Sequence, residues 1–285
     1  MRVFITGFSG QLGYDVAKVL ESRGIDYKGV SSKDLDITDA SAVDDMLTSY
    51  RPDAVIHCAA FTKVDLAESV PERCWAVNVD GTRNIAASCR KLGCKMVYIS
   101  TDYVFPGDGT EPYLPDDDAN PQSVYGASKY AGELAVRCLL DKFFIVRISW
   151  VFGINGSNFI KTMLRIGSTH NEVRVVNDQI GSPTYTADLA PLLCDMVMTE
   201  KYGIYHATNE GDFISWYDFT REIYRQAGYA TKVLPVTTAE YGLNAAKRPS
   251  NSRMCKTKLA ENGFSLLPPW QNALSRYLGQ LNSQE

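Results

Sequence analysis

Short apolar runs alternate with helix-length amphipathic segments through the first half of this chain. The runs lie at Arg2–Thr6, Ile25–Val30, Ala54–His57, Lys95–Ser100 and Phe143–Ile148, and the helical patterns at Gln11–Ser22, Ala40–Ser49, Arg73–Leu92 and Val124–Leu140. The runs are apolar throughout, which is typical of strands buried on both faces. Strands separated by helices of this length predict βαβ units, an α/β fold and a doubly wound parallel sheet.

After about Trp150 the pattern becomes irregular and is punctuated by Gly, Asn and Pro. Short helices are predicted at 159–166, 187–198, 216–227 and 269–281, and strand fragments at 173–176, 204–207 and 232–235. We therefore expect a nucleotide-binding domain over 1–152, to which part of 184–210 returns. A smaller, discontinuous α/β substrate domain is expected over 153–183 and 211–285.

Composition narrows the class of protein. The chain has 285 residues, 45% of them hydrophobic, which suffices for one large domain with a small annex. The net charge is −4 and no basic run occurs, so no nucleic-acid partner is expected. No apolar stretch reaches the roughly 18 residues of a membrane span, and no leader pattern opens the chain, so a cytoplasmic protein is expected.

The cysteines and histidines predict no metal site. Seven cysteines, an odd number without a C-x-x-C pair, predict free buried thiols in a reducing compartment. The three histidines are scattered along the chain. Because His57 and His206 each close a strand-like run, we interpret both as core residues with satisfied hydrogen bonds.

Three glycines follow the first strand in a G-x-x-G-x-x-G spacing, at Gly7, Gly10 and Gly13. Gly7 suits a tight turn, Gly10 lets the backbone approach a diphosphate, and Gly13 permits close contact between helix and strand. The helix N-terminus then directs N–H groups and its dipole at the anion. The spacing predicts a dinucleotide site in a Rossmann-like sheet, the alternative being a plain tight turn.

Two further features lie near the predicted cofactor. Ala59 and Ala60 follow the third strand, and such small residues at a carboxyl edge leave room for a ligand. Asn78 is a polar residue within an apolar helical pattern. It is interpreted either as part of the site or as a tie between helix and sheet.

Tyr125 and Lys129 lie one helical turn apart, so they share a helix face. Reduction of a ketone requires hydride on carbon and a proton on oxygen. Tyrosine can donate that proton if a neighbouring cation lowers its pKa. Thr101 follows the fourth strand, where its hydroxyl can polarise the carbonyl oxygen. These three residues predict a hydride-transfer enzyme.

These residues resemble the extended short-chain dehydrogenase/reductases, and nearly the whole chain is similar to the dTDP-4-dehydrorhamnose reductase family. The resemblance rests on segments Gly7–Gly13, Ala59–Glu68, Val77–Asn78, Ser100–Phe105, Tyr125–Lys129, Arg147–Gly153, Asp178–Thr184 and Arg248–Ser252. It implies NADPH- or NADH-dependent reduction of the C4 keto group of a dTDP-linked 4-keto-6-deoxy sugar to dTDP-L-rhamnose. It also implies Thr101, Tyr125 and Lys129 as catalytic residues.

The resemblance further implies two sets of binding residues. Cofactor contacts are expected at Gly7, Gly10, Gln11, Leu12, Ser31, Asp36, Ile37, Ala59, Ala60, Thr62, Asn78, Tyr125 and Lys129. Substrate contacts are expected at Val64, Thr101, Tyr103, Tyr125, Trp150, Asn158 and Arg248. For Arg248 the alternatives are a cation for the nucleotide diphosphate, which arginine suits, and a tie within its own loop.

The second strand bears on cofactor choice. NAD-selective sites place an acid at its end, where the acid repels a 2′-phosphate. Here the strand is followed by Ser31, Ser32 and Lys33, and Asp34 is the first acid. We expect NADPH to work at least as well as NADH, because no carboxylate stands at the expected position.

Some alternatives stay open. Related 4,6-dehydratases carry Thr-Asp-Glu where this chain has Thr101-Asp102-Tyr103, which favours simple reduction. A different 4-keto sugar nucleotide, or a regulatory subunit that binds NADP without turnover, fits the same segments. Some family members dimerise through Mg²⁺. Asp15 and Asp188 are acidic, but their spacing does not establish a site, and a monomer or a homodimer is expected.

Overall fold

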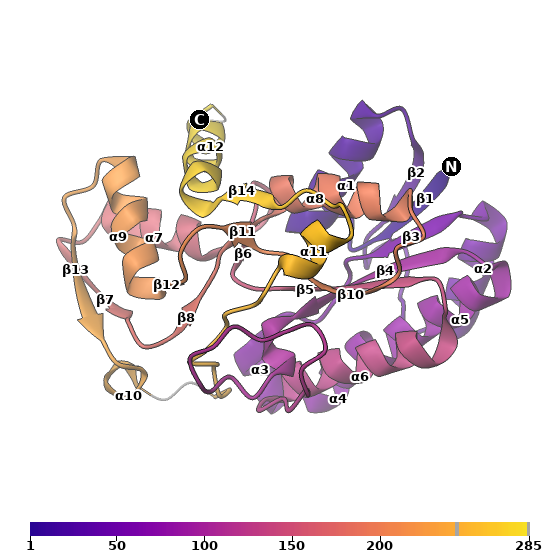
Figure 1. The fold of residues 1–285 in the computed structure, drawn as a ribbon, viewed down its shortest axis with the longest axis horizontal. Coiled ribbons are helices and arrows are strands. Elements are labelled where there is room, and N and C mark those ends of the chain that lie inside the picture. Colours follow the sequence, from indigo (N-terminus) through magenta and orange to yellow (C-terminus); the bar gives the residue numbers. More distant parts are fainter. Residues whose placement is uncertain (243–244, 284–285) are drawn as a thin grey trace.

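A six-stranded parallel sheet forms the centre of the computed structural model, which describes residues 1–242 and 245–283 (Figure 1). The strand order is β10-β5-β4-β3-β1-β2. The strands are β1 (Arg2–Thr6), β2 (Asp26–Val30), β3 (Ala54–His57), β4 (Lys95–Thr101), β5 (Phe143–Ile148) and β10 (Gly203–His206). The chain leaves β1 towards β2 and returns on the other side with β3. The topological switch point, where such sheets bind ligands, therefore lies between β1 and β3.

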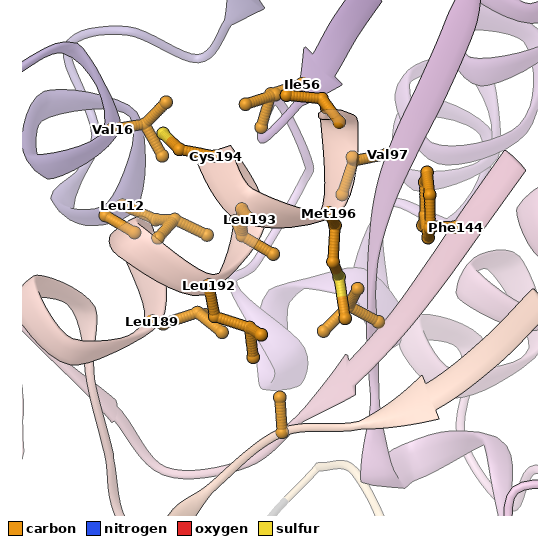
Figure 2. Close-up of a cluster of buried hydrophobic side chains, with 14 of the residues drawn as sticks. Leu12, Val16, Ile56, Val97, Phe144, Leu189, Leu192, Leu193, Cys194 and Met196 are labelled. Carbon is orange, nitrogen blue, oxygen red and sulfur yellow. The ribbon is translucent and has the colours of Figure 1, made fainter. Parts of the chain in front are cut away.

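Helices cover both faces of this sheet. On one face lie α1 (Gln11–Ser22) and α8 (Thr186–Val197); on the other lie α2 (Ala40–Tyr50), α5 (Thr82–Leu92) and α6 (Val124–Leu139). Along β1, Val3 and Ile5 pack into the first layer and Phe4 into the second. Figure 2 shows side chains of α1 and α8 packed over Ile56 and Val97. Burial on both faces explains why the strand runs are apolar throughout.

The predicted helix at Arg73–Leu92 is instead three consecutive pieces. They are α4 (Pro71–Trp75), a π-helical turn (Ala76–Gly81) and α5. Within the turn, the Asn78 side chain donates to the Phe61 carbonyl and to Ser128 Oγ, and it accepts from the Phe61 N–H at 2.8 Å. These bonds join the turn to the loop after β3 and to α6, and π-bulges of this kind are frequent at functional sites.

The chain after residue 150 builds four two-stranded sheets and further helices. The strand pairs are β6 (Val151–Phe152) with β9 (Thr184–Tyr185), β7 (Glu172–Val176) with β13 (Lys232–Val236), β8 (Ile180–Gly181) with β12 (Ile214–Ser215), and β11 (Asn209–Glu210) with β14 (Leu267–Pro269). The helices are α7 (Phe159–Gly167), α9 (Trp216–Ala227), α10 (Thr238–Tyr241), α11 (Thr257–Glu261) and α12 (Trp270–Asn282). An aromatic core that includes Phe152, Phe219 and Tyr277 joins several of them. Within the described ranges, no helix has the length and apolar character needed to cross a bilayer.

The two buried histidines differ. The ring nitrogens of His57 lie 2.6 Å from Thr6 Oγ1 and 3.2 Å from Thr82 Oγ1, so its predicted satisfaction is confirmed. Neither ring nitrogen of His206 has a hydrogen-bond partner within 3.5 Å among the described residues, although the backbones of Cys255 and Tyr113 lie near enough to raise its pKa, so its predicted satisfaction is not confirmed. Burial and the nearby Arg147 lower the pKa of His206 to about 3, which keeps the ring neutral. All seven cysteines are free, as expected, but the predicted burial holds only for Cys74, Cys89, Cys94 and Cys194; Cys58 and Cys255 are partly exposed and Cys138 is exposed.

Candidate active site

A cavity of about 930 Å³ opens along the carboxyl ends of the central strands. Its volume is in the range of small-molecule and cofactor sites. The predicted residues that line it are Gly7, Gly10, Gln11, Leu12, Ser31, Asp36, Ile37, Ala59, Ala60, Thr62, Thr101, Tyr125 and Lys129. The sequence reasoning did not identify Arg73, Ala76 and Ser149, which also line the wall. The carboxyl ends of β1, β2, β4 and β5, the loop after β3, the helices α1, α4 and α6, and the π-helical turn thus share one cavity.

The glycine turn shows why side chains are excluded after β1. Gly7 has a φ of +69°, and a Cβ there would stand 2.7 Å from the Ala59 nitrogen. A Cβ on Gly13 would strike the Gly7 carbonyl oxygen and stand 2.9 Å from Phe8 Cα. A Cβ on Gly10 would meet only the Gly7 oxygen, at 3.1 Å. Gly7 and Gly13 therefore serve the packing of the turn, whereas Gly10 leaves the cavity wall bare.

Tyr125 and Lys129 reach the cavity from the first turns of α6. The helix begins after Ser123, whose side chain accepts a hydrogen bond from the Gly126 N–H at 3.1 Å. Lys129 is 2% exposed, and its Nζ lies 4.1 Å from the centre of the Tyr98 ring. The described residues supply no hydrogen-bond acceptor to Nζ. Burial lowers the pKa of Lys129 to about 7, although the Glu133 carboxylate opposes the shift.

Tyr125 is half-buried, with its ring edge-to-face against Tyr103 at a centroid distance of 5.5 Å. Burial raises the pKa of Tyr125 above its ordinary value, and hydrogen bonding by Thr101 offsets part of that rise. Desolvation is the largest influence on this pKa. That Lys129, together with the oxidised nicotinamide, lowers it stays a prediction.

A buried ion pair lies one helical turn beyond Lys129. Arg147 of β5 donates to both oxygens of Glu133, at 2.9 and 2.7 Å, and Ser100 Oγ donates to the same carboxylate at 2.5 Å. Arg147 also donates to the Pro115 carbonyl at 2.9 Å. The sequence reasoning missed this network. The available indication was an arginine within an otherwise apolar strand, since buried charges are almost always paired.

A second buried carboxylate, Asp102, lies beside Thr101 and lines the cavity. Thr101 Oγ1 donates to it at 2.9 Å, and Ser252 Oγ donates to it at 2.5 Å. Burial raises the pKa of Asp102 to about 6. Asp102 is not among the site residues predicted from the sequence, where it counts only against dehydration.

Several predicted site residues lie outside the cavity wall. Asn78 forms the tie described above, which leaves its amide occupied. Val64 opens α3 (Val64–Ser69). Asn158 caps α7 and donates to Gln11 Oε1, the Gly153 carbonyl and Tyr277 Oη. Its side chain is therefore engaged within the protein.

Tyr103 and Arg248 meet at a small hollow beside the main cavity. Arg248 forms an ion pair with Asp65 at 2.5 Å and donates to Tyr103 Oη at 3.3 Å. In this structure Arg248 therefore acts as a tie between segments. Trp150 stacks on Trp216 with a centroid distance of 3.7 Å. Its φ of +49° is rare for a bulky residue and marks strain between β5 and β6.

The end of β2 is followed by a turn that brings a carboxylate to Ser31. Asp34 turns back, so that one carboxylate oxygen accepts from the Ser31 N–H at 2.8 Å and from Ser31 Oγ at 2.6 Å. Asp34, the first acid after the strand, thus reaches Ser31 through a tight turn. The expectation that NADPH works at least as well as NADH stays a prediction.

The two acidic residues considered for Mg²⁺ are both bonded within the chain. Asp15 accepts from Thr186 Oγ1 at 2.5 Å, and Asp188 pairs with the Arg276 guanidinium at 2.7 Å. The arginine thus fills the place of a cation at Asp188. Across 1–242 and 245–283, no group of three or more His, Cys, Asp or Glu side chains is arranged to hold a metal.

Comparison with known proteins finds relatives that match almost the whole chain. A dTDP-4-dehydrorhamnose reductase of Streptomyces griseus is 40% identical over 280 residues, covering 96% of this chain and 92% of the relative. A spore coat polysaccharide biosynthesis protein of Bacillus subtilis is 40% identical over 282 residues, covering 99% and 98%.

Solved structures agree with these relatives. The dTDP-4-dehydrorhamnose reductase of Bacillus anthracis, solved in complex with NADP, is 45% identical, with a TM-score of 0.95 and coverage of 98% of this chain and 99% of that one. The model of the RmlD substrate binding domain family matches residues 1–283. Together with the cavity and the Thr101–Tyr125–Lys129 arrangement, these matches show that the chain belongs to the RmlD substrate binding domain family.

Proposed function

We propose that this protein reduces the C4 keto group of dTDP-4-dehydro-β-L-rhamnose, giving dTDP-L-rhamnose, with NADPH working at least as well as NADH. The observation that supports this most is the meeting of Thr101, Tyr125 and Lys129 on the wall that continues from the Gly7 turn. Names of relatives with about 40% identity indicate the same substrate class. Residues 1–152 with part of 184–210 would bind the cofactor, and 153–183 with 211–285 the sugar nucleotide.

The residues present fit a nicotinamide dinucleotide. The cavity passes the side-chain-free turn at Gly7 and ends at Lys129, whose buried ammonium has no acceptor among the described residues. Ribose hydroxyls would supply that acceptor and hold the lysine charged. NADPH, when bound, supplies the hydride. Tyr125 donates its proton to the keto oxygen, Lys129 stabilises the resulting phenolate, and Thr101 polarises the carbonyl.

Around that centre, Tyr103 and Trp150 would border the sugar. Arg248 would exchange its bond to Asp65 for the nucleotide diphosphate, since arginine suits phosphate oxygens. The remaining proposed contacts are Val64 and Asn158 for the substrate and Asn78 for the cofactor.

The test follows NADPH oxidation with dTDP-4-dehydro-L-rhamnose and identifies the product. Tyr125→Phe should lower kcat by about 10²–10⁴-fold while NADPH affinity changes little. Tyr130→Phe is the matched control, because Tyr130 lies on the same helix and outside the cavity wall. A Tyr125→Phe variant that keeps more than about half of the turnover would exclude Tyr125 as the proton donor.

A further inference from the structure

The Asp102 carboxylate is buried between two hydroxyl donors from distant parts of the chain. Thr101 Oγ1 donates to Oδ1 at 2.9 Å, and Ser252 Oγ donates to Oδ2 at 2.5 Å. Asp102 is 3% exposed, as is Ser252. The Ser252 N–H donates to the Ile180 carbonyl at 2.7 Å, which fixes the serine in place. No lysine or arginine among the described residues pairs with Asp102, so its charge is not neutralised by an ion pair.

The proton of the Thr101 hydroxyl decides what this residue can do. The hydroxyl has a single proton and two acceptors within reach: Asp102 Oδ1 at 2.9 Å and the Tyr125 oxygen, whose pKa a bond from Thr101 lowers. While Asp102 is ionised, the proton is directed at Oδ1, and the Tyr103 N–H donates to the hydroxyl oxygen at 3.3 Å. A hydroxyl held in this way offers the cavity only lone pairs. Polarising a keto oxygen requires the opposite, because the carbonyl accepts hydrogen bonds and cannot donate them.

We propose that Asp102 is a positioning residue whose neutral form turns the Thr101 hydroxyl towards the keto oxygen, with Ser252 holding the second carboxyl oxygen. A neutral Asp102 donates its own O–H to Thr101, and the threonine proton then points into the cavity. The proton of Asp102 is not consumed: hydride goes to carbon and the Tyr125 proton to oxygen. This inference rests on the proposed reduction and adds a requirement for protonated Asp102.

The groups around Asp102 set the pH at which its carboxyl group titrates. Burial raises its pKa to about 6, whereas hydrogen bonds from Ser252, from Thr101 and from the backbone N–H groups of Asp102 and Tyr103 lower it. The titratable groups facing it are the hydroxyls of Tyr103, in the same turn, and of Tyr125, on α6. Arg248, from the segment that contains Ser252, bonds Tyr103 and Asp65 instead. Removing the Ser252 hydroxyl should therefore raise the pKa of Asp102.

The test is the pH profile of kcat/KM for the sugar nucleotide in four proteins. In the wild type, kcat/KM should fall about tenfold per pH unit above the pKa of Asp102. Deprotonation of Lys129 should cause a second fall in kcat/KM above the pKa of Lys129. In Asp102→Asn the amide donates to Thr101 at every pH, so the first fall should disappear. Asp102→Ala, which offers Thr101 no donor, should have kcat at least about tenfold below that of Asp102→Asn. In Ser252→Ala the first fall should move to higher pH.

Infrared titration of the ligand-free enzyme gives a readout independent of turnover. The protonated carboxyl band of Asp102 should disappear as pH rises through about 6, persist to higher pH in Ser252→Ala, and be absent from Asp102→Asn. The inference is overturned if the pH profile of Asp102→Asn equals that of the wild type. It is also overturned if the first fall in kcat/KM of Ser252→Ala occurs at the wild-type pH or at a lower pH. If turnover and the Tyr125→Phe loss are as expected, such results refute the role of Asp102 alone. Absence of any turnover in wild type refutes the proposed function.

Discussion

Two glycines of one turn should fail in different ways when each is replaced by alanine. A Cβ on Gly13 would strike the Gly7 oxygen and stand 2.9 Å from both the Gly7 carbonyl carbon and Phe8 Cα. Ordinary contact begins at 3.4 Å, so the turn must move away from α1 by at least 0.5 Å, which is 3.4 minus 2.9. All three opposing atoms belong to the backbone and cannot rotate away.

The expected loss of unfolding free energy in Gly13→Ala is the difference between two opposing contributions. Overpacking costs about 1–3 kcal/mol, and rigid backbone contacts place Gly13→Ala near the upper value. The better helix propensity of alanine offsets about 1 kcal/mol. The expected net loss in unfolding free energy is about 2 kcal/mol, or about 4 °C in Tm for a chain of this size. Calorimetry on the cofactor-free protein measures it.

Gly10→Ala is the matched control. Gly10 has a φ of −82° and a ψ of 179°, which alanine adopts freely, and the only close atom is the Gly7 oxygen at 3.1 Å. We expect a change in unfolding free energy below about 1 kcal/mol. The methyl group instead stands on the bare cavity wall, so the Kd for NADPH, measured by fluorescence titration, should rise at least about tenfold. Gly10→Ala with unaltered NADPH affinity, or with a larger loss of stability than Gly13→Ala, would refute this division of roles.

Three further predictions concern charges. Arg147→Met leaves Glu133 buried and unpaired, so denaturant unfolding should show a loss of about 3–5 kcal/mol; a loss below about 1 kcal/mol would contradict the pairing. Lys33→Glu should shift the kcat/KM preference towards NADH, because it adds negative charge beside Ser31, and Asp34→Asn should shift it towards NADPH, because it removes negative charge there. Shifts of both variants towards the same cofactor would contradict this role of charge. Arg248→Ala should raise KM for the sugar nucleotide, and equal weakening of NADPH binding would place Arg248 elsewhere.

The sheet could be predicted to within one residue at each strand end. That accuracy has a physical cause, since strands buried on both faces are apolar at every position and bounded by turn residues. The bounds of α1 and α9 match the predicted ranges. The π-helical turn could not be predicted, because it depends on bonds from Asn78 to Phe61 and Ser128. The latter is 50 residues away along the chain.

The site residues likewise divide into those that local sequence indicates and those that depend on distant contacts. The Gly7 turn and the Tyr125–Lys129 spacing are local, so their positions on the cavity wall could be inferred from neighbours in sequence. The bond between Asp102 and Ser252 joins residues 150 positions apart, and no local pattern indicates it. The left-handed backbone at Trp150 was equally hidden, since sequence alone favours glycine or asparagine for that conformation.

The irregular half of the chain is attached to the sheet through the same elements that form the cavity. Gln11, the first residue of α1, accepts hydrogen bonds from the Gly153 N–H at 2.8 Å and from Asn158 at 3.1 Å. At the catalytic end, Ser252 bonds Asp102. A shift of these later segments therefore acts on the glycine turn and on the Thr101 hydroxyl together. For this reason Gln11 and Asp102, which line the cavity, also connect it to the later segments of the chain.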